Sequence, residues 1–201
     1  MNRLPASRLA REDFAGPTLA VARRLLGSTL CHRIGGETRR GRIVEVEAYT
    51  DDPASHAADG KRTPRNEVMF GPPGVAYVYF TYGMHHCFNV VTEVVGRPGA
   101  VLIRGLDGIP RAAGPALLCV ALGLTLRANR RDLAIDSDLW IEAGPRPPRP
   151  SIVCTTRVGI RRATGLRHRL YLLGSPGVSR RDRTAEQRRG RGARLPVKDT
   201  A

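Results

Sequence analysis

The sequence predicts a single compact α+β domain, in which helices surround a curved, mostly antiparallel β-sheet and one β-hairpin protrudes. Three observations favour this class. The 201 residues suffice for one hydrophobic core and leave little room for a second. Hydrophobic residues make up 41% of the chain, as in globular proteins. The expected strands occur in runs, with helices before and after them, rather than alternating with helices.

The first helix and the first strand pair are expected within the N-terminal 49 residues. Asp13 can cap a helix that continues through Leu25, and Gly27 would end it. Apolar, β-branched runs at residues 28–34 and 42–49 then predict two strands. A short glycine-containing turn separates these runs, so the pair is expected to form a hairpin.

A long polar connection and a second strand pair follow. Residues 50–73 contain few periodic apolar positions, and ordered loops of that length usually carry function. Residues 75–82 and 87–93 predict two strands on either side of a tight tip at Gly83 and Met84. This pair is the expected protruding hairpin.

The second half of the chain adds short strands and one helix. Residues 100–105 predict a strand, and Gly114-Pro115 opens a helix that Gly123 ends. Further short strands are expected at residues 139–143, 152–158 and 170–173. Residues 1–179 are expected to form the domain. Residues 180–201 are expected to be a basic, flexible C-terminal tail, because they contain many arginines and few apolar side chains.

The charge of the chain points to a polyanionic partner. The net charge is +15 and the isoelectric point is about 11.1. The sign alone leaves DNA, RNA and an anionic membrane surface open. The longest apolar stretch, near residues 116–126, is too short to cross a bilayer. Since the N-terminus lacks a signal-peptide core, we expect an intracellular protein, cytoplasmic and nucleoid-associated if it is prokaryotic.

Metal ligands are present but not in a familiar spacing. The four cysteines are scattered without a Cys-x-x-Cys pair, which argues against a zinc ribbon or an iron–sulfur cluster. His85 and His86 are adjacent, and on a strand their side chains would point to opposite faces. A metal-dependent hydrolase therefore stays an alternative with little support from spacing.

Two acidic side chains and a tyrosine share one face of the strand at residues 42–49. Alternation places Glu45, Glu47 and Tyr49 together, opposite a row of apolar side chains. Taken alone, this face fits the solvent-exposed side of an edge strand best. The competing interpretation is a carboxylate at the floor of a cleft, where it can act as a general base.

Aromatic residues concentrate in the second strand pair. Aromatics are only 5% of the chain, yet four of them lie between residues 77 and 82. Tyr77 and Phe80 are expected to pack in the core. Tyr82 and Met84 lie at the expected tip, where a core role is difficult, and there they could act as a wedge between base steps of DNA.

Read together, these segments resemble the alkyladenine (methylpurine) DNA glycosylase family over most of the chain, from about residue 9 to 187. The matching motifs are residues 44–49, His56, residues 62–66, Met69-Phe70, and residues 77–79, 82–84, 87–90, 101–104, 131–133, 157–160 and 174–176. The resemblance implies one α+β domain, no metal and no cofactor. It also implies a monomer that acts on double-stranded DNA containing alkylated purines.

The resemblance assigns roles to residues position by position. Glu47 is implied to activate water, and Arg104 to support that water and the target's phosphate. Tyr49, His56 and Tyr79 are implied to line the pocket for the extruded base. The helix that opens at Gly114-Pro115 lacks the lysine usual in this family.

A second set of residues is implied to recognise the base and the DNA. Asn89 would guard the pocket against unwanted purines, and Tyr82 would fill the space left in the base stack. Thr63 and Arg65 match a loop that contacts the DNA backbone. With Met84 at the tip, these residues form the expected DNA-binding set.

The implied reaction suits these residue types. An alkylated purine is cationic and leaves readily, so one carboxylate that deprotonates water can suffice. Glycosylases that also cut the strand form a Schiff base with an amine. The only lysines, Lys61 and Lys198, lie outside the implied site, so a plain abasic site is the expected product. Charge and aromatic content alone would also fit a non-enzymatic nucleic-acid-binding protein.

Overall fold

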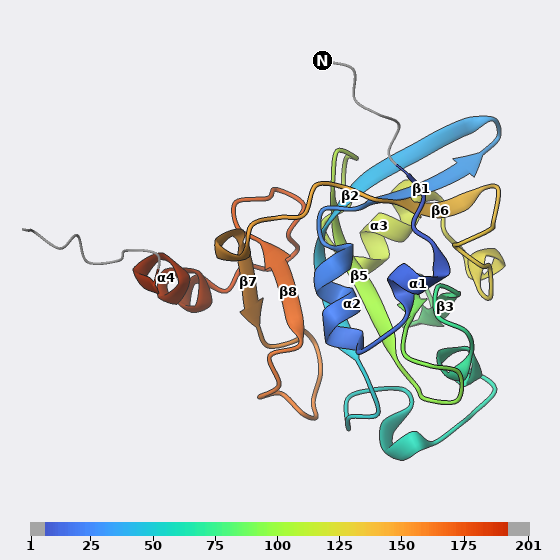
Figure 1. Cartoon of the computed structure of the whole chain (residues 1–201), viewed down its shortest axis with the longest axis horizontal. Helices are drawn as coiled ribbons and strands as arrows, with labels where there is room; N and C mark the ends of the chain where they lie inside the picture. The colour runs from blue at the N-terminus through green and yellow to red at the C-terminus, as the bar shows by residue number, and fades with distance from the viewer. Residues whose placement is uncertain (1–6, 193–201) are drawn as a thin grey trace, which may run out of the picture.

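The protein is built around a single antiparallel sheet (Figure 1). The structure is a computed structural model, and it describes residues 7–192. Within those residues the sheet has eight strands, in the order β3-β4-β5-β2-β1-β6, and the ribbon β7-β8 joins it through β2. The strands are β1 (Thr29–Ile34), β2 (Glu37–Tyr49), β3 (Ala76–Thr81), β4 (His85–Val91), β5 (Ala100–Asp107), β6 (Leu139–Glu142), β7 (Ile152–Thr155) and β8 (Arg169–Leu172).

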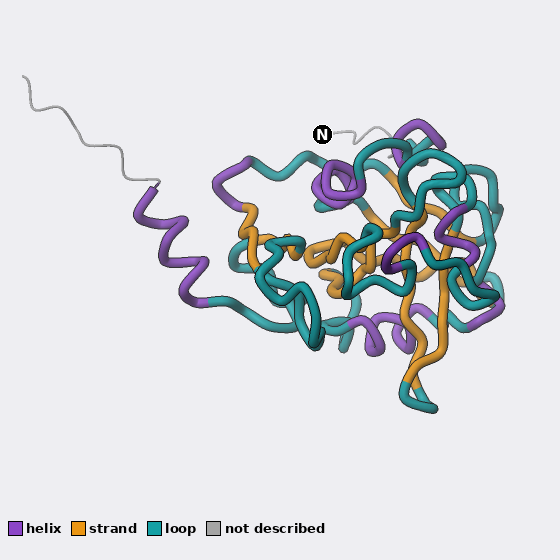
Figure 2. Tube along the Cα trace, turned by 90° about the horizontal axis from the view of Figure 1, so that it is seen from below, coloured by secondary structure: helices purple, strands orange, loops and turns teal. Residues whose placement is uncertain are grey.

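Helices cover both sides of this sheet. Figures 1 and 2 show α2 on one side and α3 on the other. α2 packs on β2 and β5, whereas α3 packs on β4 and β5. The α-helices are α1 (Arg11–Phe14), α2 (Thr18–Leu25), α3 (Pro115–Leu122) and α4 (Arg183–Gly192), and the 3-10 turns are η1 (Ala58–Gly60), η2 (Glu67–Phe70), η3 (Leu126–Ala128) and η4 (Arg149–Ser151). The expected α+β class is confirmed.

The strand β2 is the centre of the sheet. One edge pairs with β5, from Arg42↔Asp107 to Tyr49↔Ala100. Its other edge pairs first with β1 and then, from Glu45 to Glu47, with β8. The register between β2 and β5 shifts around Glu45, which marks a β-bulge. Both edges of the strand that carries the acidic residues are therefore occupied.

The N-terminal helix differs from its prediction. Asp13 does not cap a helix that runs to Leu25; instead its carboxylate accepts a hydrogen bond from Ala10 N within the short helix α1. Gly16 follows with a φ of +117°, and Pro17 precedes α2. A glycine with positive φ followed by a proline does not continue a helix, so α1 ends before Gly16 and α2 starts anew after Pro17.

The segment at residues 183–192 also differs from its prediction. These residues belong to the stretch expected to be a basic, flexible tail, and in the structure they form α4, at the left of Figure 2. Ala185 is buried in the main core, and the Tyr171 hydroxyl donates a hydrogen bond to Glu186. These contacts hold the helix on β7 and β8. The remaining part of the expected tail, residues 193–201, lies outside the described residues.

Strands β3 and β4 pair antiparallel from Ala76↔Val90 to Thr81↔His85, and residues 82–84 connect them. Of the two aromatics expected in the core, Tyr77 is buried, at 2% exposure. Phe80 is not; it is 41% exposed and packs beside the His86 ring. The core prediction for Phe80 was wrong, because Phe80 lies near the end of β3, whereas Val78 on the same face is buried in the core. Within residues 7–192, none of the helices has the length and apolar character that a bilayer crossing needs.

Candidate active site

Glu45 and Glu47 are both fully buried, with 0% exposure. The interpretation of this face as the exposed side of an edge strand is therefore wrong. It fails because β8, which comes from residues 169–172, covers the edge of β2 at the level of these two carboxylates. Buried carboxylates need partners, because an unpaired charge in the interior is costly.

Three groups hold the Glu47 carboxylate. The Tyr49 hydroxyl donates to Oε2 at 2.8 Å, and Arg104 Nη1 approaches the same oxygen at 3.3 Å. The backbone N–H of Val158 donates to Oε1 at 2.7 Å. The carboxylate is thus fixed in orientation by partners from three separate segments of the chain.

Arg104 bridges the two carboxylates. Its Nε lies 3.2 Å from Glu45 Oε1, and its Nη1 contacts Glu47. Glu45 also accepts hydrogen bonds from Arg169 Nη1 at 2.9 Å and from Ser179 N at 2.6 Å. Burial lowers the pKa of Arg104, but the two neighbouring carboxylates outweigh this effect and raise it. Arg104 therefore stays charged and balances part of the buried negative charge.

A cavity of about 390 Å³ opens beside this network. Most of the residues predicted to bind the base or the DNA line its wall. The lining residues are Tyr49, Ala54, His56, Met69, Tyr77, Tyr79, Thr81, Tyr82, Cys87, Asn89, Ala100, Leu102, Arg104, Pro115, Val158, Gly159 and Ile160. Glu47 is not in this wall. It lies directly behind it, bonded to three residues that are.

The wall combines neutral aromatic rings. The His56 and Tyr79 rings meet edge to face with centroids 4.6 Å apart, and Tyr77 and Tyr79 lie 5.4 Å apart. Burial raises the pKa of Tyr49 and of Tyr79, so both hydroxyls stay protonated at neutral pH. Partial burial, with a smaller contribution from Arg65, lowers the pKa of His56. The aromatic part of the wall therefore presents uncharged donors and π-faces, and Arg104 is the charged side chain in the lining.

Hydrogen bonds fix the polar part of the wall. Asn89, which is almost fully buried, donates through Nδ2 to the Tyr77 carbonyl at 3.0 Å. His56 Nδ1 and the Tyr77 hydroxyl are hydrogen-bonded at 2.8 Å. Asn66 donates to the His56 carbonyl at 2.6 Å. The side chain of Asn66 thereby braces the long connection at residues 50–73 internally, and the bond between His56 and Tyr77 joins that connection to β3.

Two of the tyrosine rings already contact a cation. The Arg157 guanidinium lies 4.7 Å from the centre of the Tyr49 ring, and the Arg65 guanidinium lies 5.2 Å from that of Tyr79. Arg157 is fully buried and pairs with both oxygens of Asp52, at 2.6 and 2.9 Å. Arg65 is exposed and donates to the Phe80 carbonyl at 3.1 Å.

The remaining predicted residues lie around the cavity mouth or away from it. Tyr82 is 84% exposed, reaches the cavity wall and has a φ of +52°. Met84 is 69% exposed and lines a smaller hollow near α3 instead. Thr63 is in the turn before Asn66 and does not line the cavity. Tyr82 and Met84 are thus both solvent-exposed apolar side chains at one turn.

The structure adds wall residues that the sequence analysis assigned no role. They include Cys87, Leu102 and Pro115, and the backbone of Val158 supplies a direct bond to Glu47. A backbone donor has no signature in the sequence, since any residue except proline could provide it. The side chains considered as metal ligands do not form a cluster of three or more within residues 7–192.

Comparisons with known proteins agree with this arrangement. The family model "Methylpurine-DNA glycosylase (MPG)" matches residues 12–176. A Myxococcus xanthus protein is 51% identical over 168 residues, which cover 80% of this chain and 83% of the relative. A Carboxydothermus hydrogenoformans protein is 44% identical over 190 residues, covering 86% and 99%. One from Bacillus cereus is 44% identical over 200 residues, covering 84% and 97%.

All three relatives carry the name "Putative 3-methyladenine DNA glycosylase". The match of the family model covers most of the chain, and it includes the strands that carry the buried carboxylates and the aromatic cavity. This chain belongs to the methylpurine-DNA glycosylase family.

Proposed function

We propose that this protein is a monofunctional DNA-repair glycosylase that turns an alkylated purine out of the duplex and hydrolyses its bond to deoxyribose. One observation carries the proposal: a buried carboxylate, Glu47, is held by Tyr49, Arg104 and Val158 N immediately behind a tyrosine-lined cavity. A cavity of about 390 Å³ is in the range of small-ligand sites.

Extrusion of the base explains the exposed aromatic at the cavity mouth. A base within the duplex hides its sugar carbon, and unstacking it costs a few kcal/mol. Tyr82 can replace the lost stacking, because it is 84% exposed and yet reaches the cavity wall. The positive charge of the chain supplies contacts to phosphates.

The cavity favours a purine whose charge makes it a good leaving group. Neutral tyrosines can stack on a cationic ring, an effect of about 0.5–2 kcal/mol. Arg157 and Arg65 already occupy positions over two of these rings, so the gain for a cationic base is at the low end of that range. Discrimination then depends mainly on how readily the alkylated purine departs.

Glu47 is proposed to take the proton from the attacking water, and its negative charge stabilises the oxocarbenium-like sugar. Arg104 would orient Glu47 and contact the target's phosphate. The only lysine within the described residues, Lys61, is exposed and outside the cavity wall. With no amine placed for a Schiff base there, an unbroken strand with an abasic site is the expected product.

Base release from alkylated DNA tests the proposal. Wild-type protein should release 3-methyladenine, and Glu47→Gln should slow single-turnover release by at least about 100-fold while binding to the same duplex is kept. Glu45→Gln is the matched control, since it neutralises a second buried carboxylate bonded to Arg104. Compared with Glu47→Gln, Glu45→Gln should lower the stability of the protein more and slow base release less.

The outcomes separate the alternatives. A wild-type protein that binds DNA tightly but releases no base would be a non-enzymatic binding protein, and the proposal would fail. If Glu47→Gln lost duplex binding together with base release, Glu47 would have a structural role. Strand cleavage at the abasic site by the wild type would contradict the monofunctional assignment.

A further inference from the structure

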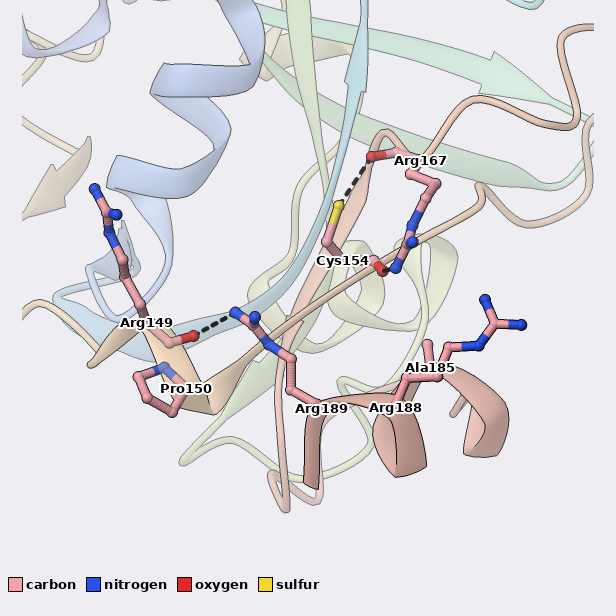
Figure 3. Close-up of a pocket in the computed structure, with 7 residues that line it drawn as sticks. All are labelled: Arg149, Pro150, Cys154, Arg167, Ala185, Arg188 and Arg189. Atoms are coloured by element: carbon pink, nitrogen blue, oxygen red, sulfur yellow. Dashed lines mark hydrogen bonds between the residues drawn. The ribbon is translucent and has the colours of Figure 1, made fainter. Parts of the chain in front are cut away.

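A second concave site lies on the opposite side of β8 from β2. It is a groove of about 390 Å³ between β7, the turn η4 and helix α4. Figure 3 shows the seven residues around it, and four are arginines. The arginine groove is lined by Arg149, Pro150, Cys154, Arg167, Ala185, Arg188 and Arg189. Neither aspartate nor glutamate occurs in this lining, so the groove is strongly electropositive.

The charge of the groove is not balanced within the described residues. No ion pair of the described residues involves any of its four arginines. The nearest acidic residues on or before α4 are engaged elsewhere. Glu186 accepts a hydrogen bond from Tyr171, and Asp182 accepts one from Thr155. Among the described residues, no carboxylate therefore pairs with the arginines of the groove.

The fold holds two of the arginines in place and leaves two available. Arg189 donates through Nε to the Ile152 carbonyl at 2.6 Å and through Nη2 to the Arg149 carbonyl. Arg167 donates to the Cys154 carbonyl at 2.5 Å. Each guanidinium has five N–H donors, so both keep donors for a ligand. Arg149 and Arg188 are exposed, and no side-chain hydrogen bond joins either to another described residue.

One loop of the chain borders both the arginine groove and the candidate active site. The connection from β7 to β8, residues 156–168, contributes Val158, Gly159 and Ile160 to the cavity wall and Arg167 to the groove. β8 pairs with β2 at Glu47, and β7 pairs with β8. Two strand spacings separate β7 from β2, about 10 Å. At 3.4 Å per nucleotide of one strand, this is about three base-pair steps.

We propose that the arginine groove binds the phosphodiester backbone of the DNA duplex a few base pairs from the nucleotide that enters the cavity. Guanidinium groups suit this ligand because they donate paired hydrogen bonds to phosphate oxygens. The proposal deepens the proposed function and rests on it, since DNA is taken as the partner. It adds a contact that lies outside the cavity and its mouth.

The double variant Arg149→Gln/Arg188→Gln tests the groove with the least risk to the fold, because neither side chain is bonded to the described residues. The matched control is Arg33→Gln/Arg111→Gln, which removes the same charge from two exposed positions. Arg33 pairs with Thr38, at the far end of β2 from Glu47. At about 3.3 Å per residue, that end is about 30 Å away.

Affinity for an undamaged duplex of about 25 base pairs is measured over a range of NaCl concentrations. Two lost phosphate contacts should lower the slope of log K against log [NaCl] by about 1.8 and weaken binding by about tenfold at low salt. Single-turnover base release at saturating enzyme should change less than about twofold. On a duplex too short to reach the groove, variant and wild type should bind alike.

Several results would overturn the inference. The groove variant could bind the long duplex as tightly as the control variant does. It could lose the same affinity for long and short duplexes, or its salt slope could equal that of the wild type. Competition by millimolar inorganic phosphate as effective as by DNA would show a small-anion site instead. Failure of the proposed function is distinguishable, because wild type would then release no base while the salt slopes still differed.

Discussion

The Tyr49 hydroxyl donates a 2.8 Å hydrogen bond to Oε2 of Glu47, so a ring of the cavity wall is bonded to the carboxylate behind it. The same tyrosine can contact a base and orient the general base. Burial and the Glu47 carboxylate both raise the pKa of Tyr49, which keeps this donor protonated.

Tyr49→Phe separates these two roles. The ring and its packing remain, but Glu47 loses one of its donors. A hydrogen bond to a charged group contributes about 1.5–3 kcal/mol. Single-turnover base release should therefore slow by about tenfold or more, whereas the affinity for damaged duplex should change little. An affinity loss as large as the rate loss would show that the hydroxyl acts in binding, and Tyr79→Phe serves as the comparison within the same wall.

Because the pKa of His56 is lowered, we expect protonation of His56 to reduce base release on the acid side of the pH profile. Its pKa lies below the ordinary value of 6.5, so it is neutral at pH 7 and becomes cationic as the pH falls through the lowered value. A cationic His56 would repel a cationic purine in the cavity. Release of 7-methylguanine should fall in that pH window for the wild type, and His56→Gln should move or remove this limb.

The same shift has a consequence for stability. Between the lowered pKa and 6.5 the unfolded chain binds more protons at this position than the folded protein does, so stability rises with pH there. The contribution is present above 6.5 and is lost as the pH falls through the lowered value. Urea unfolding of His56→Gln should be less sensitive to pH in this window. Equal pH dependence in both proteins would contradict the assignment.

The sequence could predict which side chains share a face, but not what covers that face. Alternation along residues 42–49 correctly placed Glu45, Glu47 and Tyr49 together. Their burial depends on β8, whose partner residues follow Glu47 by more than a hundred positions in the chain. Pairing over such separations leaves no local pattern, which is why an exposed edge strand was the better local interpretation.

The other differences between prediction and structure concern the first helix, the segment at residues 183–192 and Phe80. Gly16 and Pro17 lie between two helical patterns and should have divided the expected helix. Residues 183–192 have little apolar content, so a helix stabilised by Ala185 packing and a Tyr171–Glu186 bond had no periodic signal. Phe80 is exposed because it lies near the end of β3, although Val78 on the same face is buried.

Loss of the Asp52–Arg157 ion pair is expected to destabilise the protein, and Arg157 also contacts the cavity residue Tyr49. Arg157 is fully buried, contacts the Tyr49 ring and donates to the Ala48 carbonyl. Asp52→Asn would leave this charge without its counterion, at a cost of about 3 kcal/mol or more in the free energy of unfolding. Urea denaturation at pH 7 measures it. The control is Glu67→Gln, whose pair with Arg130 is exposed and contributes about 0–1 kcal/mol.

The sign of the pH dependence gives an independent check on Asp52. Burial raises the pKa of Asp52, but the hydrogen bonds from Arg157 outweigh this and lower it overall. Its stabilising contribution is therefore complete above the ordinary carboxyl pKa of 3.8 and is lost as the pH falls through the lowered value. Wild type and Asp52→Asn should become closer in stability in strong acid. A constant difference down to that range would show that the pair is not the cause.

The exposed turn between β3 and β4 predicts different roles for two neighbouring side chains. Tyr82 reaches the cavity wall, whereas Met84 faces a separate hollow near α3. If Tyr82 fills the gap left by an extruded base, Tyr82→Ala should slow release from duplex by about tenfold and from single-stranded DNA much less, because a single strand needs little unstacking. Met84→Ala should have a smaller effect on duplex. If Tyr82→Ala slowed base release equally on both substrates, the ring would contact the extruded base itself and would not fill the gap in the base stack.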